Sequence, residues 1–231
     1  MSRRLSPNRP HQRWETALNS RIFLAVLMVG MSTNGWSQAS TPLEVIPASS
    51  MSDALNAAPL REGPPPITPD GIPHQQHDQN APLAMQQRLM AAIFTLPGIL
   101  VVPTQFSLAG SQGWRLVRDF ARGPDDAFIS TESLEFGHLH RPSDGSMHML
   151  LPLAFSMVAL EKGWGIIHPL SDNISGENTE YVMIYGPRDE EDLRTIWIIA
   201  QISYYFARGV NMESSTAITP ATLGQVKDRF R

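Results

Sequence analysis

Short apolar runs separated by glycine and proline fill the middle of the chain, and no regular alternation of strand and helix connects them. Apolar runs of this length between turn residues are typical of β-strands. Segments with apolar residues at helical spacing flank this region and also interrupt it once. This order predicts an α+β fold, in which an antiparallel sheet of about five to six strands packs against two or three helices in a single domain.

Each element is expected at a definite place. Strands are expected at residues 99–102, 105–108, 114–117, 128–129, 134–141, 146–151 and 181–185. Helices are expected at residues 82–96, 153–162 and 189–206. The first of these helices begins at a proline, which the first helical turn tolerates, and the last has acidic residues in its first turn.

The ends of the chain are expected to lie outside this domain. Residues 1–39 have a basic leader, ten apolar residues and small residues before Ser40, an order typical of a cleaved signal peptide. The apolar run is too short for a stable membrane span, so we expect export to the periplasm or medium, or membrane anchoring if cleavage fails. Residues 40–73 are predicted to form a Pro/Ala-rich linker or arm, 74–209 the domain, and 210–231 a polar tail.

Charge and composition exclude several partners. Removing residues 1–39 changes the balance from 18 − 22 = −4 to 13 − 21 = −8, because that segment holds five arginines and one acid. An acidic domain lacks the basic surface that nucleic acids require, so a small-molecule partner is expected instead. The chain has no cysteine, which excludes disulfides, thiolate catalysis and cysteine zinc sites.

Four of the seven histidines lie between residues 135 and 169, in the segments E-F-G-H-L-H, D-G-S-M-H-M and G-W-G-I-I-H-P. Imidazole titrates near neutrality and binds metals readily, so this clustering indicates a site. His138 and His140 lie two residues apart on an expected strand and therefore face the same side of the sheet. A three-residue loop at 143–145, with Gly145 left-handed, would pair His140 with His148 and place three rings on one face.

Two neighbours of this site follow from the same reasoning. His168 comes after a Gly-Trp-Gly segment, and a loop could return it to the same mouth. By strand alternation Glu135 points away from His138 and His140, unless a β-bulge intervenes.

Three interpretations of the histidines stay open. They can form a polar strand face with satisfied interior groups, an acid/base site, or a divalent metal site made by His138, His140 and His148.

The ordered motifs of the chain resemble those of the luciferase-domain family, which includes fungal luciferases and bacterial proteins. The resemblance covers about residues 61–209. It is carried by L-R-E-G, H-Q-Q-H-D-Q-N-A-P, L-P-G-I, the three histidine segments and V-M-I-Y-G-P-R-D-E-E-D-L. The sequence departs from the family pattern at Ile166, Ile167 and Ala109, which leaves the scaffold but puts a shared substrate in doubt.

The resemblance implies an oxygenase that adds dioxygen to a small enolisable compound, hydroxypyrone-like or phenolic, without a cofactor other than dioxygen. His138, His140, His148 and His168 are then the candidate bases or ligands, and Arg188 is the candidate cation for an enolate. Arg188 could instead brace the following helix.

Glu135, Trp164 and Tyr185 are the candidate substrate contacts, although aromatic side chains more often pack in a core. A non-catalytic module that binds a small molecule or metal is the alternative, and a hydrolytic metal site with a bound water is a third.

Overall fold

The computed structural model describes residues 41–212, which include thirteen helical and strand elements. The helical elements are η1 (Ala48–Ser50), α1 (Met51–Ala57), α2 (Leu83–Phe94), η2 (Asp125–Ala127), α3 (Leu153–Glu161), α4 (Ser171–Ile174) and α5 (Glu190–Ala207). The strands are β1 (Ile99–Pro103), β2 (Gln112–Leu116), β3 (Glu135–Leu139), β4 (Met147–Pro152), β5 (Gly165–Ile167) and β6 (Thr179–Ile184).

The strands form one open sheet in the order β1-β2-β3-β4-β6-β5, and every neighbouring pair is antiparallel. This confirms the predicted α+β class. The three expected helices are present as α2, α3 and α5. Two expected strands are absent: residues 105–108 form the loop of the β1–β2 hairpin, and residues 128–129 lie outside the named strands.

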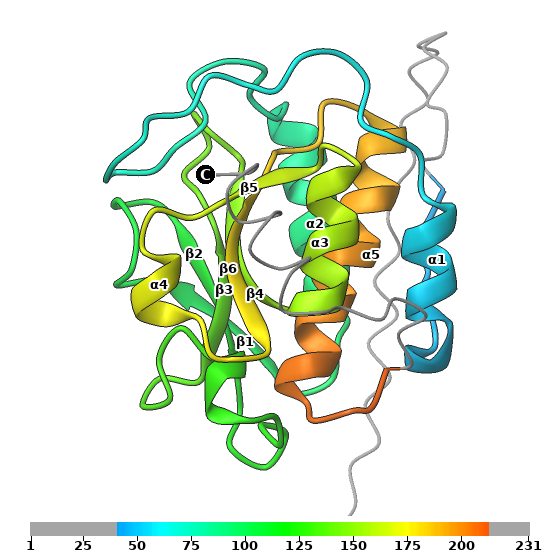
Figure 1. Ribbon diagram of the computed structural model, residues 1–231, viewed down its shortest axis with the longest axis vertical. Helices are drawn as coiled ribbons and strands as arrows, with labels where there is room; N and C mark the ends of the chain where they lie inside the picture. Colours follow the sequence, from blue (N-terminus) through cyan, green and yellow to red (C-terminus); the bar gives the residue numbers. More distant parts are fainter. Residues whose placement is uncertain (1–40, 213–231) are drawn as a thin grey trace, which may run out of the picture. The chain divides into compact units, whose positions relative to one another are not determined.

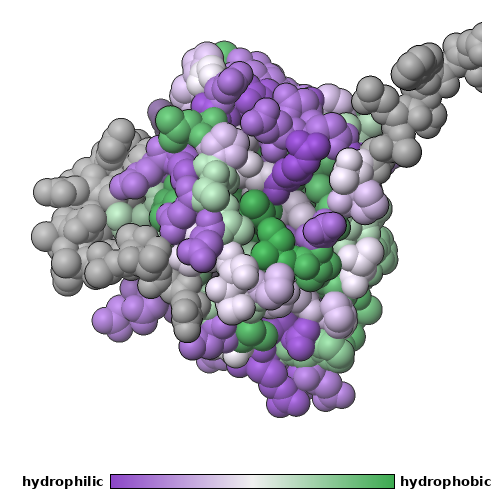
Figure 2. Space-filling view, turned by 90° about the vertical axis from the view of Figure 1, so that its right-hand side faces the viewer, coloured by the Kyte–Doolittle hydropathy of each residue, from purple (hydrophilic) through white to green (hydrophobic). Residues whose placement is uncertain are grey.

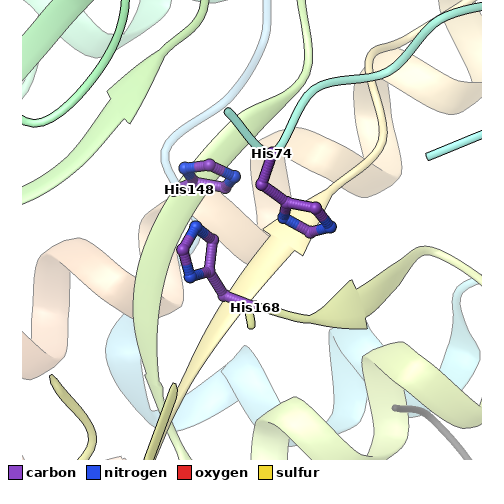
Figure 3. Close-up of side chains that lie close together, drawn as sticks. All are labelled: His74, His148 and His168. Atoms are coloured by element: carbon purple, nitrogen blue, oxygen red, sulfur yellow. The ribbon is translucent and has the colours of Figure 1, made fainter. Parts of the chain in front are cut away.

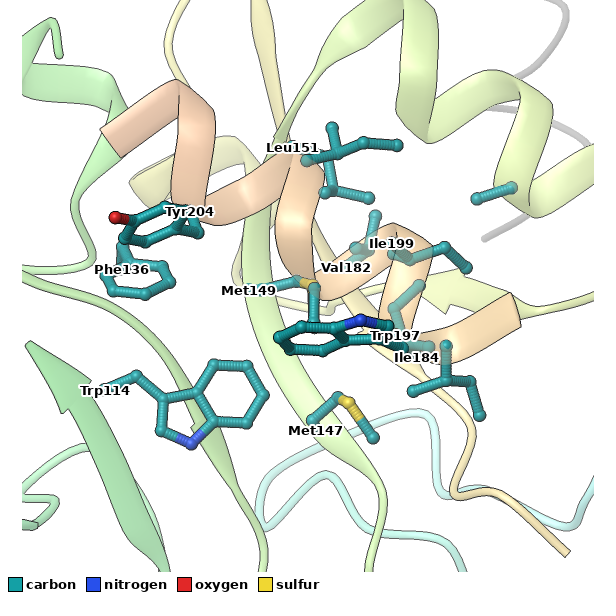
Figure 4. Packing of buried hydrophobic residues seen from close by; sticks show 14 of the residues in the cluster. Trp114, Phe136, Met147, Met149, Leu151, Val182, Ile184, Trp197, Ile199 and Tyr204 are labelled. Carbon is teal, nitrogen blue, oxygen red and sulfur yellow. The ribbon is translucent and has the colours of Figure 1, made fainter. Parts of the chain in front are cut away.

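The helices α1, α2, α3 and α5 lie on one face of the sheet, while the short α4 lies on the other (Figure 1). Alternate residues of β4, such as Met147 and Met149, point toward the helices and pack with Trp197 of α5 (Figure 4). A core of this kind stabilises the domain by removing apolar area from water, at about 25 cal/mol per Å². The opposite face of β4 carries His148 and is therefore free to form a site.

The outer surface of the helical layer is mixed in polarity. Figure 2 shows hydrophobic residues in the centre of one face with hydrophilic residues around them. None of the helices within residues 41–212 is long and apolar enough to cross a membrane.

The predicted linker or arm, residues 40–73, contains the helix α1, which the sequence analysis did not anticipate. Met51 and Leu55 of α1 are buried in the core. Beyond α1 the chain forms an extended covering segment (residues 58–80), which Trp164 anchors by donating a hydrogen bond from Nε1 to the Pro59 carbonyl at 2.9 Å. The apolar residues of α1 lie only four positions apart, and two residues are too few to reveal a helical period among the prolines and alanines.

The predicted signal peptide, residues 1–39, lies outside the described residues, as does the tail beyond Met212.

The β3–β4 turn corrects the expected register. His138, not His140, pairs with His148, and the His140 amide donates to the Ser146 carbonyl at 2.9 Å. The connection is therefore the five-residue loop 141–145 rather than a three-residue one. Both loops have an odd number of residues, so the three histidines keep the predicted common face.

Gly145 ends this turn with φ +78°, as predicted, and α2 packs directly against it. Gln86 of α2 donates from Nε2 to the carbonyl oxygens of Ala81 and Pro142, at 2.8 and 2.9 Å. A Cβ atom added at Gly145 would lie 2.6 Å from that same Nε2 and 2.7 Å from the Ala81 Cβ. The turn therefore requires glycine both for its backbone conformation and for the space.

We expect Gly145→Ala to lower the free energy of unfolding by about 2–3 kcal/mol, because the left-handed backbone alone costs a non-glycine residue roughly 1–2 kcal/mol. Urea denaturation measures the change. Gly71→Ala is the matched control, since nothing lies within 4 Å of a Cβ added there. Equal unfolding midpoints for the two variants would contradict this account of the turn.

Candidate functional site

Five buried histidines meet on the sheet face opposite the helical core. Exposed fractions are 0% for His138, 2% for His140, 4% for His148, 5% for His168 and 4% for His74. The centroids of the His140 and His168 rings each lie 4.3 Å from that of His148. The three histidines predicted on one face are thus together, His168 joins them from its separate loop, and His148 is the central ring.

A β-bulge brings Glu135 into this cluster. Gly113 pairs with His138 and Trp114 with Gly137, but Arg115 pairs with Glu135, so β3 holds one extra residue. The extra residue reverses the alternation, and Glu135 turns to the histidine face instead of away from it. Its Oε1 lies 3.2 Å from Nδ1 of His138.

The Glu135 carboxylate is held by two further groups. The Thr104 hydroxyl donates to Oε1 at 2.5 Å, and Arg115 Nε approaches Oε2 at 3.4 Å. An ionised carboxylate only accepts hydrogen bonds and has room for more than two donors, so it can also accept one from His138. His138 therefore places its proton on Nδ1, and its Nε2 presents a lone pair.

His140 forms a second carboxylate–imidazole pair in the same orientation. Its Nδ1 lies 2.6 Å from Oδ2 of Asp144, whose Oδ1 accepts from the Ser146 hydroxyl at 2.6 Å. Burial alone would raise the pKa of Asp144, but hydrogen bonds from His140 and Ser146 act in the opposite direction, and the pKa is lowered. When His140 is neutral, the ionised Asp144 accepts the proton on its Nδ1, and Nε2 then presents the second lone pair.

Both lone pairs point at one atom. Nδ1 of His148 lies 3.2 Å from Nε2 of His138 and 3.2 Å from Nε2 of His140. The other ring nitrogen, Nε2 of His148, is buried and has no hydrogen-bond partner among the described residues.

His168 and His74 cover His148 from two separate segments (Figure 3). His168 follows β5, and its Nδ1 accepts the Leu170 amide at 3.0 Å, so its Nε2 carries the proton of the neutral ring. His74 belongs to the covering segment, and its ring stacks on His148 with an interplanar angle of 11°.

A cavity of about 300 Å³ opens over these rings. Its polar floor is His74, His148, His168 and the ring of Tyr181, which packs on His168 at 4.4 Å between centroids. The rest of the lining is largely apolar, and it comes from the covering segment, the β1–β2 loop, the segment before β3 and the α4 region. These residues are Ile72, Pro73, Gln75, Phe106, Ser107, Leu108, Ile129, Leu170 and Ile174. Such a space suits a small, mostly apolar ligand with a few polar atoms.

Burial keeps the rings that line the cavity neutral. It lowers the pKa of His74 to about 4 and that of His168 to about 3, and neighbouring histidines lower both further. Burial and the surrounding rings also hold the pKa of His148 well below its usual value. Burial raises the pKa of Tyr181, so its hydroxyl remains a donor at neutral pH.

Three predicted site residues are used elsewhere. Trp164 is 1% exposed and anchors the covering segment. Tyr185 lies under the guanidinium of Arg61, 5.2 Å from ring centroid to Cζ. Arg188 donates to Asp192 from Nε at 2.6 Å and to the Glu62 carbonyl at 2.8 Å, so it braces the start of α5 and does not join the histidines.

Sequence reasoning missed three members of the site, which are His74, Asp144 and Tyr181. Asp144 lies in the predicted loop 143–145, and that prediction does not show that its carboxylate turns back toward His140 and Ser146. Tyr181 shares a face with His148, because it pairs with Leu150 while His148 pairs with Met183. His74 gave no usable signal, because only the path of the covering segment brings it to the sheet.

Among residues 41–212, two groups of three histidines have ligand atoms within 4.8 Å of one another and could hold a metal ion. One is His138, His140 and His148, and the other is His74, His148 and His168. His148 belongs to both groups. The first group contains the three residues predicted from the sequence.

Comparison with known proteins finds a match for the region that holds four of the five histidines, all except His74. Residues 133–203 match the family model described as "Luciferase domain". The luciferase of Armillaria mellea is 26% identical over 159 residues, which are 63% of this chain and 59% of that protein. The luciferase of Neonothopanus nambi is 36% identical over 81 residues, 35% of this chain and 30% of that protein. The chain thus spans less than two thirds of these relatives, and no solved structure matches it significantly.

We expect stability to decrease as the pH falls below about 6.5. The unfolded chain takes up protons on His74 and His168 near that pH, whereas the folded chain does so only near pH 4 and 3. Between about pH 6.5 and its folded-state pKa, each ring then lowers the free energy of unfolding by up to about 1.4 kcal/mol for each unit that the pH falls. Chemical denaturation between pH 7 and 4 measures the slope.

His168→Gln should flatten this slope, whereas the control His77→Gln, at an exposed position, should keep it. A wild-type stability that is independent of pH across the window would contradict the buried neutral rings.

Proposed function

We propose, from the match of residues 133–203 to the luciferase-domain model and the similarity to fungal luciferases, that the chain is an oxygenase of a small enolisable compound, hydroxypyrone-like or phenolic. The observation that supports this most is the apolar cavity with neutral imidazoles at its floor. Dioxygen is the expected cosubstrate, and no organic cofactor is needed for the chemistry.

The cavity supplies both a base and a donor. His74 and His148 are the candidate bases, because each has one buried ring nitrogen with no partner among residues 41–212. His168 donates through Nε2–H, since the Leu170 amide occupies its Nδ1. A hydrogen-bond donor aimed at a developing enolate lowers its energy most where water is excluded.

The proposed reaction has two steps, removal of the enol proton and addition of dioxygen. The base takes the enol proton, and His168 holds the enolate oxygen. The enolate carbon donates its electron pair to dioxygen, a C–O bond forms, and the terminal peroxide oxygen takes the proton back from the base. The product is a hydroperoxide, in which dioxygen has been reduced and the substrate carbon oxidised.

Export is part of the proposal. The signal-peptide pattern of residues 1–39 supports a periplasmic or secreted protein. An acidic mature domain without cysteine is suited to an oxidising compartment.

The alternative is a module that binds a small molecule or metal without turnover. His138 and His140 are buried and do not line the cavity, so a small molecule in the cavity would not contact them. For a non-catalytic module, this favours a metal ion over a small molecule as the ligand of these two rings.

Oxygen uptake in the presence of a series of hydroxypyrones and phenols tests the proposal. We expect uptake by the wild type, and a fall in kcat of at least about 10²-fold in His74→Gln or His148→Gln, whichever removes the base. The control His77→Gln changes an exposed ring and should retain the wild-type rate. Binding of a candidate to the folded protein without oxygen uptake by any compound in the series would favour the binding module.

A further inference from the structure

We infer that His138, His140 and His148 form a binding site for one divalent first-row transition-metal ion, located behind the cavity floor. His148 lines the cavity, while His138 and His140 do not. The ion would therefore contact the inner nitrogen of His148, away from any ligand in the cavity. This inference does not depend on the cavity being catalytic.

Three ring nitrogens that face one another share too few protons. Glu135 and Asp144 take the Nδ1 protons of His138 and His140, so two Nε2 lone pairs face His148 Nδ1 at 3.2 Å each. A neutral His148 has one proton, which can satisfy at most one of these two acceptors. The other acceptor then faces a nitrogen without a proton for it. A cation bound by the lone pairs of all three nitrogens removes this repulsion.

The spacing of the ring nitrogens also fits a metal ion. Metal–nitrogen bonds of 2.0–2.1 Å in tetrahedral geometry separate two ligand nitrogens by about 3.3–3.4 Å. The two distances of 3.2 Å to His148 are close to this value. Imidazole ligands without thiolates suit zinc, copper, iron and nickel.

Two carboxylates lie behind the rings of His138 and His140. Histidines that bind metals commonly donate their other N–H to a carboxylate, which fixes the tautomer and increases the basicity of the ligand nitrogen. Glu135 and Asp144 occupy these positions for His138 and His140, and Ser146 and Thr104 orient the two carboxylates. This arrangement needed both the bulge in β3 and the five-residue turn.

The competing group, His74, His148 and His168, fits an ion less well. Nδ1 of His168 accepts the Leu170 amide at 3.0 Å, so its remaining nitrogen carries a proton in the neutral ring. Binding an ion through Nε2 would require this proton to leave. The proton would either move to Nδ1, which breaks the hydrogen bond from the Leu170 amide, or be lost, which makes the ring an imidazolate.

A metal at this site would change the role of His148. With Nδ1 bound to the ion, the proton of the neutral ring lies on Nε2, on the side of His74 and His168. His148 would then be a hydrogen-bond donor, strengthened by the charge of the ion, and His74 would be the remaining base of the cavity.

Zinc titration of the full chain, carrying no added histidine tag and first treated with a chelator, tests the inference. We expect calorimetry to show one Zn²⁺ per chain with a Kd below about 1 µM. His140→Ala should weaken binding at least about 100-fold, while Asp144→Asn, which keeps all three ligands, should weaken it about 10–100-fold at the same stoichiometry. His168→Gln and the exposed control His77→Gln should stay within about threefold of the wild type.

Two outcomes would overturn the site. The site would be excluded if the folded wild type bound no more Zn²⁺ than the triple variant His77→Gln, His138→Gln, His140→Ala. Loss of binding in His168→Gln, with full binding in a folded His140→Ala, would move the ion to the other histidine group. Circular dichroism confirms that each variant is folded, and Asp144→Asn keeps the test valid if His140→Ala does not fold.

Oxygen uptake by the chelated protein separates this inference from the proposed function. Uptake without zinc binding would contradict the metal site and leave the oxygenase intact. Zinc binding without uptake would support the site and favour the non-catalytic module.

Discussion

The antiparallel pairing of β3 with β4 is the constraint on which the site depends. It places His138 opposite His148, and the five-residue turn that follows brings His140 and Asp144 to the same face. The other side of both strands is buried against α5, so a slip of one residue would exchange core residues such as Met149 for histidines. Packing of the helical core therefore fixes the arrangement of the polar site.

The second requirement is a cover over the exposed face of the sheet. The covering segment provides His74 and part of the cavity wall, and hydrogen bonds from Trp164 and to the Lys162 carbonyl hold its start in place. Arg188 connects the same segment to α5 through the Glu62 carbonyl. Residues expected to contact substrate thus act in the structure by positioning the segment that closes the site.

Much of this was accessible from the sequence because alternation along a strand is a strict rule. An odd loop length keeps His148 on the face of His138 and His140, so the common face was correct although the paired residue was wrong. The orientation of Glu135 was not predictable, because a bulge leaves no clear mark in one sequence. His74 and α1 depend on long-range packing, which local patterns do not encode.

The central claim is that two carboxylate–imidazole pairs turn the Nε2 lone pairs of His138 and His140 toward His148. The most direct measurement is ¹⁵N-edited NMR of the imidazole rings at pH 7, with each ring assigned by its His→Gln variant. The account predicts protons on Nδ1 of His138 and His140, unprotonated Nε2 atoms in both, and a proton on Nε2 of His168. A proton on Nε2 of His138 or His140 would contradict it.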